Sequence, residues 1–305
     1  MKALWVEKYR PKDIDGYVFA DEAQREQVES WIKAKSIPHI LLSGSPGTGK
    51  TTLAKILINA LDVDEYDVLY ANGSKEARKL EWVDKLIGFC QTMPYGDVKI
   101  VLIDEADYMN ISSVQPALRN LMEDYSETVR FILTCNYPNK IMPAIHSRCQ
   151  GFHINKSDKL AFTARVIDIL DKENVSFGEE LATYIDATYP DLRKCIQTIQ
   201  QNSTEGVLRK AAEAAHDTKE WRLDFVDLFK KGKVKEARLL LCSQAMPDEM
   251  QEIFRWMYDN LDIWGKTDDE QDEAIKIIAK GIATHSMVAD YEINLSATII
   301  ELGQI

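Results

Sequence analysis

Short strand-like runs alternate with longer amphipathic segments through the first half of the chain. A run that is apolar on both faces is typical of a strand in a parallel sheet that helices cover on both sides. The pattern therefore predicts an α/β fold, a parallel sheet flanked by helices. The expected strands are residues 40–42, 67–72, 100–103, 130–136 and 151–154, and the expected helices are residues 21–35, 51–61, 80–93 and 112–125.

Beyond residue 155 the pattern becomes helical. Three segments predict a small helical domain, and a break near residues 216–219 separates it from a second group of helices. We expect domains at residues 1–154, 155–215 and 216–305. Trp256, Tyr258, Leu261 and Trp264 recur at helical spacing, which favours core or subunit interface over a ligand site. The expected helices are residues 157–173, 178–186, 191–201, 220–231, 234–243, 247–264, 268–285 and 289–302.

A glycine-rich turn connects the first expected strand with the helix after it. Its residues fit the phosphate-loop pattern G-x-x-x-x-G-K-[ST], and an ordinary glycine-rich turn is the alternative. Such a loop presents backbone N–H groups and a helix N-terminus to phosphate oxygens. Lys50 can then reach the β- and γ-phosphates, and the Thr51 hydroxyl can hold Mg²⁺. The expected nucleoside triphosphate site comprises Gly44, Ser45, Pro46, Gly47, Thr48, Gly49, Lys50, Thr51 and Thr52.

Two carboxylates follow the apolar run at residues 100–103. The carboxyl ends of parallel strands meet at one edge of the sheet, beside the phosphate loop. We expect Asp104 to orient Mg²⁺ and Glu105 to polarise the attacking water, which Asn136 is placed to hold. An acidic strand end in solvent is the alternative. The letters D-E-A-D at residues 104–107 do not indicate a helicase, because the phosphate loop lies too close to them for that superfamily.

An aromatic and basic segment, residues 5–11, precedes the phosphate loop. One interpretation is that this region wraps the nucleotide's base, with Tyr9, Arg10 and Val18 among the contacts. The other is an N-terminal arm packed on the core. The pattern alone does not choose between the two.

Composition narrows the choice of partners and compartment. The 305 residues carry a net charge of −12, so any contact with nucleic acid must come from a local basic strip. The five cysteines show no C-x-x-C spacing, which argues against zinc and disulfide sites and fits a reducing compartment. The first residues are charged where a signal peptide is apolar, and no run approaches the ~20 apolar residues of a membrane span. We expect a cytosolic protein without a membrane partner.

Taken together, these motifs resemble the AAA+ ATPases of the sliding-clamp-loader family. Characteristic spellings are W-V-E-K-Y-R-P at residues 5–11, Q-x-A-L-R-x-x-M-E at residues 115–123 and S-R-C at residues 147–149. The spellings I-P-H-I-L-L at residues 37–42 and N-G-S at residues 72–74 lean toward the bacteriophage branch. The bacterial branch carries a zinc module that this chain lacks, so that branch is disfavoured.

The resemblance implies an AAA+ nucleotide-binding domain, a helical lid and an all-α collar through which subunits assemble. Lys50, Thr51, Asp104 and Glu105 would be the Walker residues that act on ATP and Mg²⁺, and Asn136 would be the first sensor. Arg193 would be a second-sensor arginine on the subunit's own nucleotide. Arg148 would be an arginine finger on a neighbour's nucleotide, where a positive charge stabilises the transition state.

The same resemblance implies several partners. Arg78, Lys79, Gln115 and Arg119 would contact or sense primer-template DNA, and Leu86 and Phe89 would dock on the sliding clamp. Other copies of the chain and a distinct clamp-loader subunit would complete the complex, in the host cytoplasm if the chain is encoded by a phage.

The sequence thus predicts an ATPase subunit of a DNA-polymerase clamp loader. One alternative is another AAA+ DNA motor, such as a branch-migration helicase. A second is a scaffold subunit that binds nucleotide without hydrolysing it. Lys50, Asp104, Glu105 and Arg148 are all present, which argues against the scaffold, because scaffold subunits usually lose one of these groups.

Overall fold

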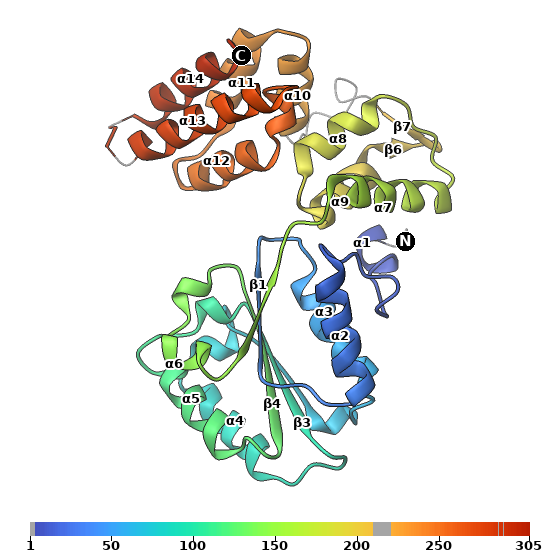
Figure 1. The fold of residues 1–305 in the computed structure, drawn as a ribbon, viewed down its shortest axis with the longest axis vertical. Helices are drawn as coiled ribbons and strands as arrows, with labels where there is room; N and C mark the ends of the chain where they lie inside the picture. The colour runs from blue at the N-terminus through green and yellow to red at the C-terminus, as the bar shows by residue number, and fades with distance from the viewer. Residues whose placement is uncertain (1–3, 210–220, 286, 289) are drawn as a thin grey trace. The chain divides into compact units, whose positions relative to one another are not determined.

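The computed structural model describes residues 4–209, 221–285, 287–288 and 290–305 (Figure 1). The chain forms two compact units: residues 9–161 make one, and residues 4–8 together with the described part of 162–305 make the other. We call them the sheet unit and the helical unit. The expected division into three domains at 154/155 and 215/216 stays a prediction.

The sheet unit is built on five parallel strands, all within residues 9–161. Their order, β2-β3-β4-β1-β5, places β4 between β1 and β3, so the carboxyl ends of these three strands are neighbours. The α/β fold class is therefore confirmed. The strands are β1 (Ile40–Gly44), β2 (Val68–Asn72), β3 (Lys99–Asp104), β4 (Val129–Cys135) and β5 (Gln150–Ile154).

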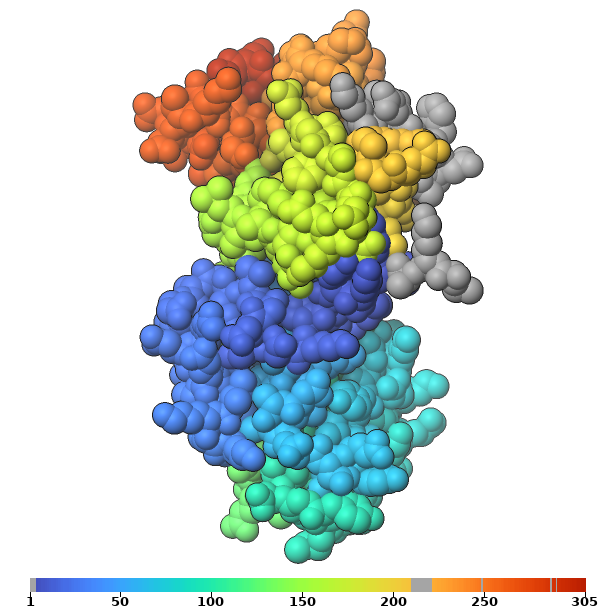
Figure 2. Space-filling model, turned by 90° about the vertical axis from the view of Figure 1, so that its right-hand side faces the viewer, coloured from blue at the N-terminus to red at the C-terminus, as the bar shows by residue number. Residues whose placement is uncertain are grey.

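Helices cover both faces of this sheet (Figure 1). In the space-filling view, the N-terminal part of the sheet unit, coloured blue, forms much of the surface that faces the viewer (Figure 2). Ile100 and Leu102 of β3 pack in the core beneath α2 and α3, whereas Val101 and Ile103 pack in the core beneath α4 and α5. This alternation explains why the run is apolar at every position, as predicted. The helices are α2 (Glu22–Ala34), α3 (Lys50–Ala60), α4 (Glu81–Gln91), α5 (Val114–Asp124) and α6 (Pro143–His146).

The helical unit contains the helices expected beyond residue 155, except that the single helix expected over residues 247–264 is divided into η7 (Pro247–Glu249), α12 and η8 (Leu261–Ile263). It also contains a two-stranded hairpin that the sequence analysis missed. The hairpin pairs β6 (Ser203–Thr204) with β7 (Val207–Leu208), two strands too short to show a periodicity. The described helices are α7 (Lys159–Lys172), α8 (Glu180–Thr188), α9 (Leu192–Asn202), α10 (Trp221–Lys230), α11 (Val234–Gln244), α12 (Met250–Asp259), α13 (Asp268–His285) and α14 (Tyr291–Leu302).

Within the helical unit, buried polar contacts join the region before residue 216 to the region after it. The Trp256 Nε1–H donates to the Asp186 carbonyl at 3.1 Å, and Asn260 Nδ2 donates to the Tyr189 carbonyl at 3.0 Å. Trp256 and Trp264 are each 4% exposed, so their interpretation as core residues is confirmed. These contacts explain why the regions before and after residue 216 belong to one compact unit.

The segment α1 (Trp5–Lys8) belongs to the helical unit, where it packs on α9. The Trp5 N–H donates to Gln200 Oε1 at 2.9 Å, and Lys8 forms an ion pair with Glu173 at 2.7 Å. For these four residues the structure supports the packed-arm interpretation.

Candidate active site

The phosphate loop has the backbone that its glycines predict. Gly47 and Gly49 adopt positive φ angles of 74° and 91°. A Cβ on Gly44 would lie 2.5 Å from the Ile154 carbonyl oxygen, so this position leaves no room for a side chain. Lys50 Nζ donates to the carbonyls of Gly44 at 2.9 Å and Ser45 at 2.7 Å, which holds the ammonium at the loop.

Tyr17 packs against the phosphate loop, a role that the sequence analysis did not predict. Its hydroxyl donates to the Thr48 carbonyl at 3.3 Å, and its ring fills the space that a Cβ on Gly49 would need. Burial raises the pKa of the Tyr17 phenol, which therefore stays neutral. A lone tyrosine ahead of a phosphate loop gives no sequence signal for this role.

The expected magnesium ligands lie together. The Thr51 hydroxyl donates to Asp104 Oδ1 at 2.8 Å, although 53 residues separate the two in the chain. A hydroxyl and a carboxylate oxygen suit a hard cation such as Mg²⁺, with phosphate oxygens completing the shell. Within the described ranges, His, Cys, Asp and Glu side chains form no group of three or more that could hold a metal without such help.

Thr134 contacts the carboxylate of Asp104 and the backbone of Glu105, and this role was also missed. Its hydroxyl donates to Asp104 Oδ1 and accepts the Glu105 N–H at 3.1 Å. The side chain is 1% exposed within the apolar run of β4, where a single threonine is indistinguishable from an ordinary strand residue. The threonine therefore fixes the carboxyl end of β3 against that of β4.

Glu105 and Asn136 follow the carboxyl ends of β3 and β4, and both are half-buried. Glu105 has a left-handed backbone, with φ 55° and ψ 43°. A Cβ on Gly73 would lie 2.2 Å from the Glu105 carbonyl oxygen, so this backbone packs tightly against the loop after β2. The topology thus brings the two groups expected to act on water to the edge that carries the phosphate loop.

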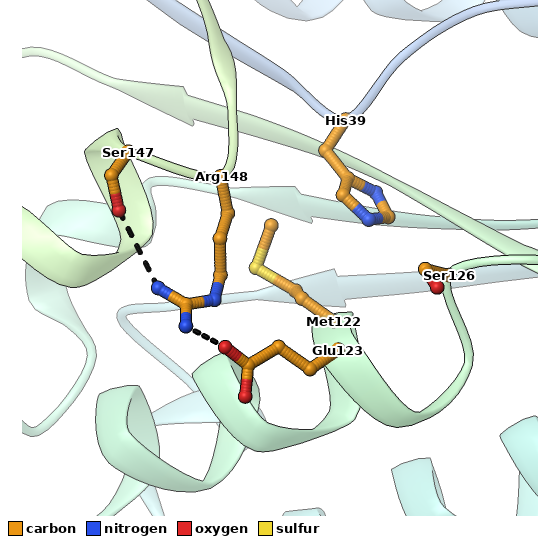
Figure 3. Close-up of a pocket in the computed structure, with 6 residues that line it drawn as sticks. All are labelled: His39, Met122, Glu123, Ser126, Ser147 and Arg148. Atoms are coloured by element: carbon orange, nitrogen blue, oxygen red, sulfur yellow. Dashed lines mark hydrogen bonds and ion pairs between the residues drawn. The ribbon is translucent and has the colours of Figure 1, made fainter.

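Arg148 lies at the amino ends of the strands, opposite to the phosphate loop. Figure 3 shows it with the other residues that line a pocket there. It lines an open pocket of about 520 Å³ with His39, the residue before β1, whereas the phosphate loop follows the other end of that strand. Arg148 forms an ion pair with Glu123, and its Nη1 donates to the Ala144 carbonyl at 2.7 Å. Contacts within its own chain therefore hold the guanidinium at the amino ends of the strands.

His39 contributes a neutral imidazole to this pocket. Burial and the nearby Arg130 lower its pKa below the ordinary value. The Nδ1 atom accepts the Phe131 N–H at 3.1 Å, which fixes the ring beside β4. Arg148 is thus the cation that the pocket presents at neutral pH.

Comparisons with known proteins agree with this geometry. The family model "ATPase family associated with various cellular activities (AAA)" matches residues 40–156, which include the phosphate loop, both carboxylates, Asn136 and Arg148. A "Replication factor C small subunit" of Methanococcus vannielii is 33% identical over 99% of this chain and 99% of its own length. The chain belongs to the replication factor C small subunit family. It is an ATPase by this membership.

Further similarities differ in what they cover. A replication factor C small subunit of Sulfurisphaera tokodaii is 41% identical over 67% of this chain and 63% of its own length. Among solved structures, a Thermotoga maritima RuvB Holliday junction branch migration motor has a TM-score of 0.54 at 16% identity, covering 81% of this chain and 80% of that one. At that identity the likeness shows the fold alone. The expected closeness to the bacteriophage branch of the clamp-loader family stays a prediction.

Two residues of this chain that were expected to contact partners are buried instead. Leu86 is 0% exposed in the core beneath α4, so its assignment as a clamp contact is wrong. Gln115 is also 0% exposed. Its Nε2 donates to the Met109 and Lys140 carbonyls, and its Oε1 accepts the Met142 N–H at 2.8 Å, so it cannot contact DNA directly.

The other surface assignments remain open to partners. Arg78 and Lys79 are exposed at and after η2 (Glu76–Arg78), whereas Arg119 is half-buried and donates to Asn120 Oδ1. Phe89 is half-buried, with Lys99 Nζ 4.6 Å from its ring centroid.

More strongly exposed apolar side chains lie near the end of α4. Met93 is 81% exposed and Tyr95 is 80% exposed, and the Tyr95 ring contacts that of Tyr66 at 5.8 Å between centroids. The sequence analysis did not single them out: it took Met93 as the end of the helix expected over residues 80–93, whereas α4 ends at Gln91, and Tyr95 lies in the loop that follows.

The remaining predicted site residues fall outside the geometry described above. Tyr9, Arg10 and Val18 are half-buried in the sheet unit, ahead of α2. Arg193 is exposed in the first turn of α9, in the helical unit. Their roles toward nucleotide stay predictions.

Among the described residues, no helix is both long and apolar enough to cross a bilayer.

Proposed function

We propose that this chain is an ATPase subunit of a DNA-polymerase clamp loader. In this role it uses ATP binding and hydrolysis to open the sliding clamp and to load it on primer-template DNA. The observation that carries the proposal is the full-length similarity to replication factor C small subunits. The separation of Arg148 from the phosphate loop, at opposite ends of the strands of one sheet, supports it further.

Each residue of the carboxyl edge has a task in this proposal. Lys50 would leave the loop carbonyls to bind the β- and γ-phosphates. Thr51 and Asp104 would hold Mg²⁺, which would neutralise phosphate charge. Glu105 orients the attacking water and takes up its proton, while Asn136 holds the same water from the next strand. Thr134 keeps Asp104 and Glu105 in register through its two hydrogen bonds.

Arg148 completes the site of a neighbouring subunit. A strand of five residues is about 13 Å long, so the two ends of β1 cannot serve one γ-phosphate. Arg148 exchanges its partner Glu123 for the neighbour's phosphate when subunits assemble. Hydrolysis then depends on assembly with other copies and with a distinct clamp-loader subunit.

DNA and clamp bind other parts of the sheet unit. Arg78, Lys79 and Arg119 supply positive charge to the phosphate backbone of primer-template DNA. Tyr66, Met93 and Tyr95 are exposed apolar and aromatic side chains of the kind that anchors protein partners, and we assign them, with the half-buried Phe89, to the sliding clamp. The complex works in the cytoplasm, that of the host if a phage encodes it.

The test is steady-state ATP hydrolysis by the purified complex, with and without primer-template DNA and the replicative clamp. We expect strong stimulation that needs both DNA and clamp. Stimulation by branched DNA without any clamp would indicate a branch-migration motor instead. ATP binding without hydrolysis under every condition would indicate a scaffold subunit.

A further inference from the structure

Asp107 is a buried carboxylate at the catalytic edge to which no role has yet been assigned. It lies in η3 (Ala106–Tyr108), two residues after Glu105, and is 5% exposed. Its Oδ2 accepts the Tyr137 N–H at 3.2 Å. Its Oδ1 is buried without a hydrogen-bond partner among the described residues.

The hydrogen bond reaches the peptide that follows Asn136. The Tyr137 N–H belongs to the peptide group whose carbonyl carbon is that of Asn136, so holding this group restricts the backbone of Asn136. The same carboxylate belongs to the short helix that begins right after Glu105. One side chain therefore connects the segments that carry the two groups expected to act on water.

We propose that Asp107 is a positioning residue that holds Asn136 in its place relative to Glu105 for ATP hydrolysis. The inference rests on the roles proposed above for these two residues. A carboxylate is a strong acceptor for a backbone N–H, which suits the task. Stability alone does not explain why an aspartate occupies this position. On burial the carboxylate loses its hydrogen bonds to water, and one neutral donor does not compensate for that loss.

The chain offers a matched control at the amino ends of the strands, away from the catalytic residues. Asp67 lies in η1 (Glu65–Asp67), just before β2, and is 0% exposed. Its Oδ2 accepts the Gly96 N–H at 2.8 Å, and its Oδ1 likewise has no partner among the described residues. Asp67 and Asp107 thus share burial and bonding and differ in their distance from the site.

The experiment measures ATP affinity and turnover of the assembled complex, without DNA or clamp. We expect Asp107→Ala to lower kcat by about tenfold or more while the Kd of ATP stays unchanged, because misplacement affects the transition state. Asp107→Asn keeps an acceptor oxygen and should retain most of the wild-type rate. Asp67→Ala should lower stability and leave kcat of the folded protein unchanged.

A double-mutant cycle separates positioning from an independent effect. If Asp107 acts through Asn136, the variant combining Asp107→Ala and Asn136→Ala should be no slower than Asn136→Ala alone. The inference would be overturned if the losses of kcat in the two single variants multiplied in the double variant. It would also be overturned by an unchanged kcat for Asp107→Ala, or by a rate for Asp107→Asn as low as that for Asp107→Ala. A normal kcat for Asn136→Ala would overturn it as well. None of these results bears on clamp loading, which fails only if DNA and clamp do not stimulate the complex.

Discussion

At the scale of single residues, the backbone of Glu105 stands out. Its left-handed conformation is uncommon for a residue with a side chain, and two contacts hold it in place: the Glu105 N–H donates to Thr134 Oγ1, and the Gly73 N–H donates to the Asp104 carbonyl at 2.7 Å. Such strain is found where the surrounding structure fixes a functional group. We connect it with the placement of the Glu105 carboxylate.

Replacing Glu105 by Gln should separate binding from hydrolysis. The amide has nearly the same shape but accepts no proton from water, so we expect turnover to fall by about 10²–10⁴-fold. The Kd of ATP, measured with a fluorescent analogue, should not change. Glu65→Gln, at an exposed position before β2, is the control. Weakened ATP binding by Glu105→Gln would contradict the assignment.

The residues that could be predicted from the sequence are those whose spacing has a chemical meaning. Lys50 and Thr51 follow a glycine pattern, and Asp104 ends an apolar run. The phosphate loop and the end of this run were therefore expected to lie side by side, and the hydrogen bond between Thr51 and Asp104 confirms it. Thr134 and Tyr17 act through contacts between distant segments, and nothing in their own neighbourhood indicates that. The direct contacts expected of Gln115 and Leu86 were wrong because they came from the resemblance, while burial depends on packing. A DNA-sensing role for Gln115 stays a prediction.

At the scale of elements, two glycines have opposite surroundings. A Cβ on Gly44 would collide with the Ile154 carbonyl, whereas a Cβ on Gly88, exposed in the interior of α4, would meet nothing within 4 Å. We expect Gly88→Ala to stabilise the protein by about 0.5–1 kcal/mol, because alanine favours the helix. Gly44→Ala should destabilise it and abolish ATP binding. Urea denaturation compares the two, and equal effects would contradict the packing described here.

Gln115 connects α5 with the loop that leads into α6. Gln115→Leu would leave the Met142 N–H and two carbonyls without this partner, so we expect a loss of about 1–3 kcal/mol in the free energy of unfolding. Gln91→Leu, at an exposed position at the end of α4, is the control and should change stability little. A direct role in binding DNA would instead weaken DNA affinity without lowering stability.

Elements were predicted well where apolar periodicity is long. The helices α13 and α14 lie within two residues of their expected bounds. The hairpin of β6 and β7 was missed because two-residue strands are stabilised by tertiary contacts, not by their own pattern.

At the scale of the whole molecule, the phosphate loop and the carboxylates lie at the carboxyl ends of the strands, and Arg148 lies at the amino ends. Under the proposed function, these two positions are different halves of an active site. A single subunit would then lack a cation for its γ-phosphate from this arginine, and assembly would supply it.

Mixing two inactive variants tests this division. Arg148→Ala should keep ATP affinity and lose stimulated turnover, and Lys50→Ala should lose ATP binding. In a mixed complex, the intact phosphate loop of one variant meets the intact Arg148 of the other, so we expect part of the turnover to return. If Arg148 served its own subunit, no mixture would recover activity.

The most direct measurement follows the clamp itself. The assembled complex is incubated with labelled clamp and primed circular DNA, and the DNA is then separated from free protein. We predict that clamp stays with the circle only after incubation with ATP and is released when the circle is cut, because a closed ring slides off a free end. Clamp that associates equally well without ATP, or that never remains on the circle, would contradict the clamp-loader account.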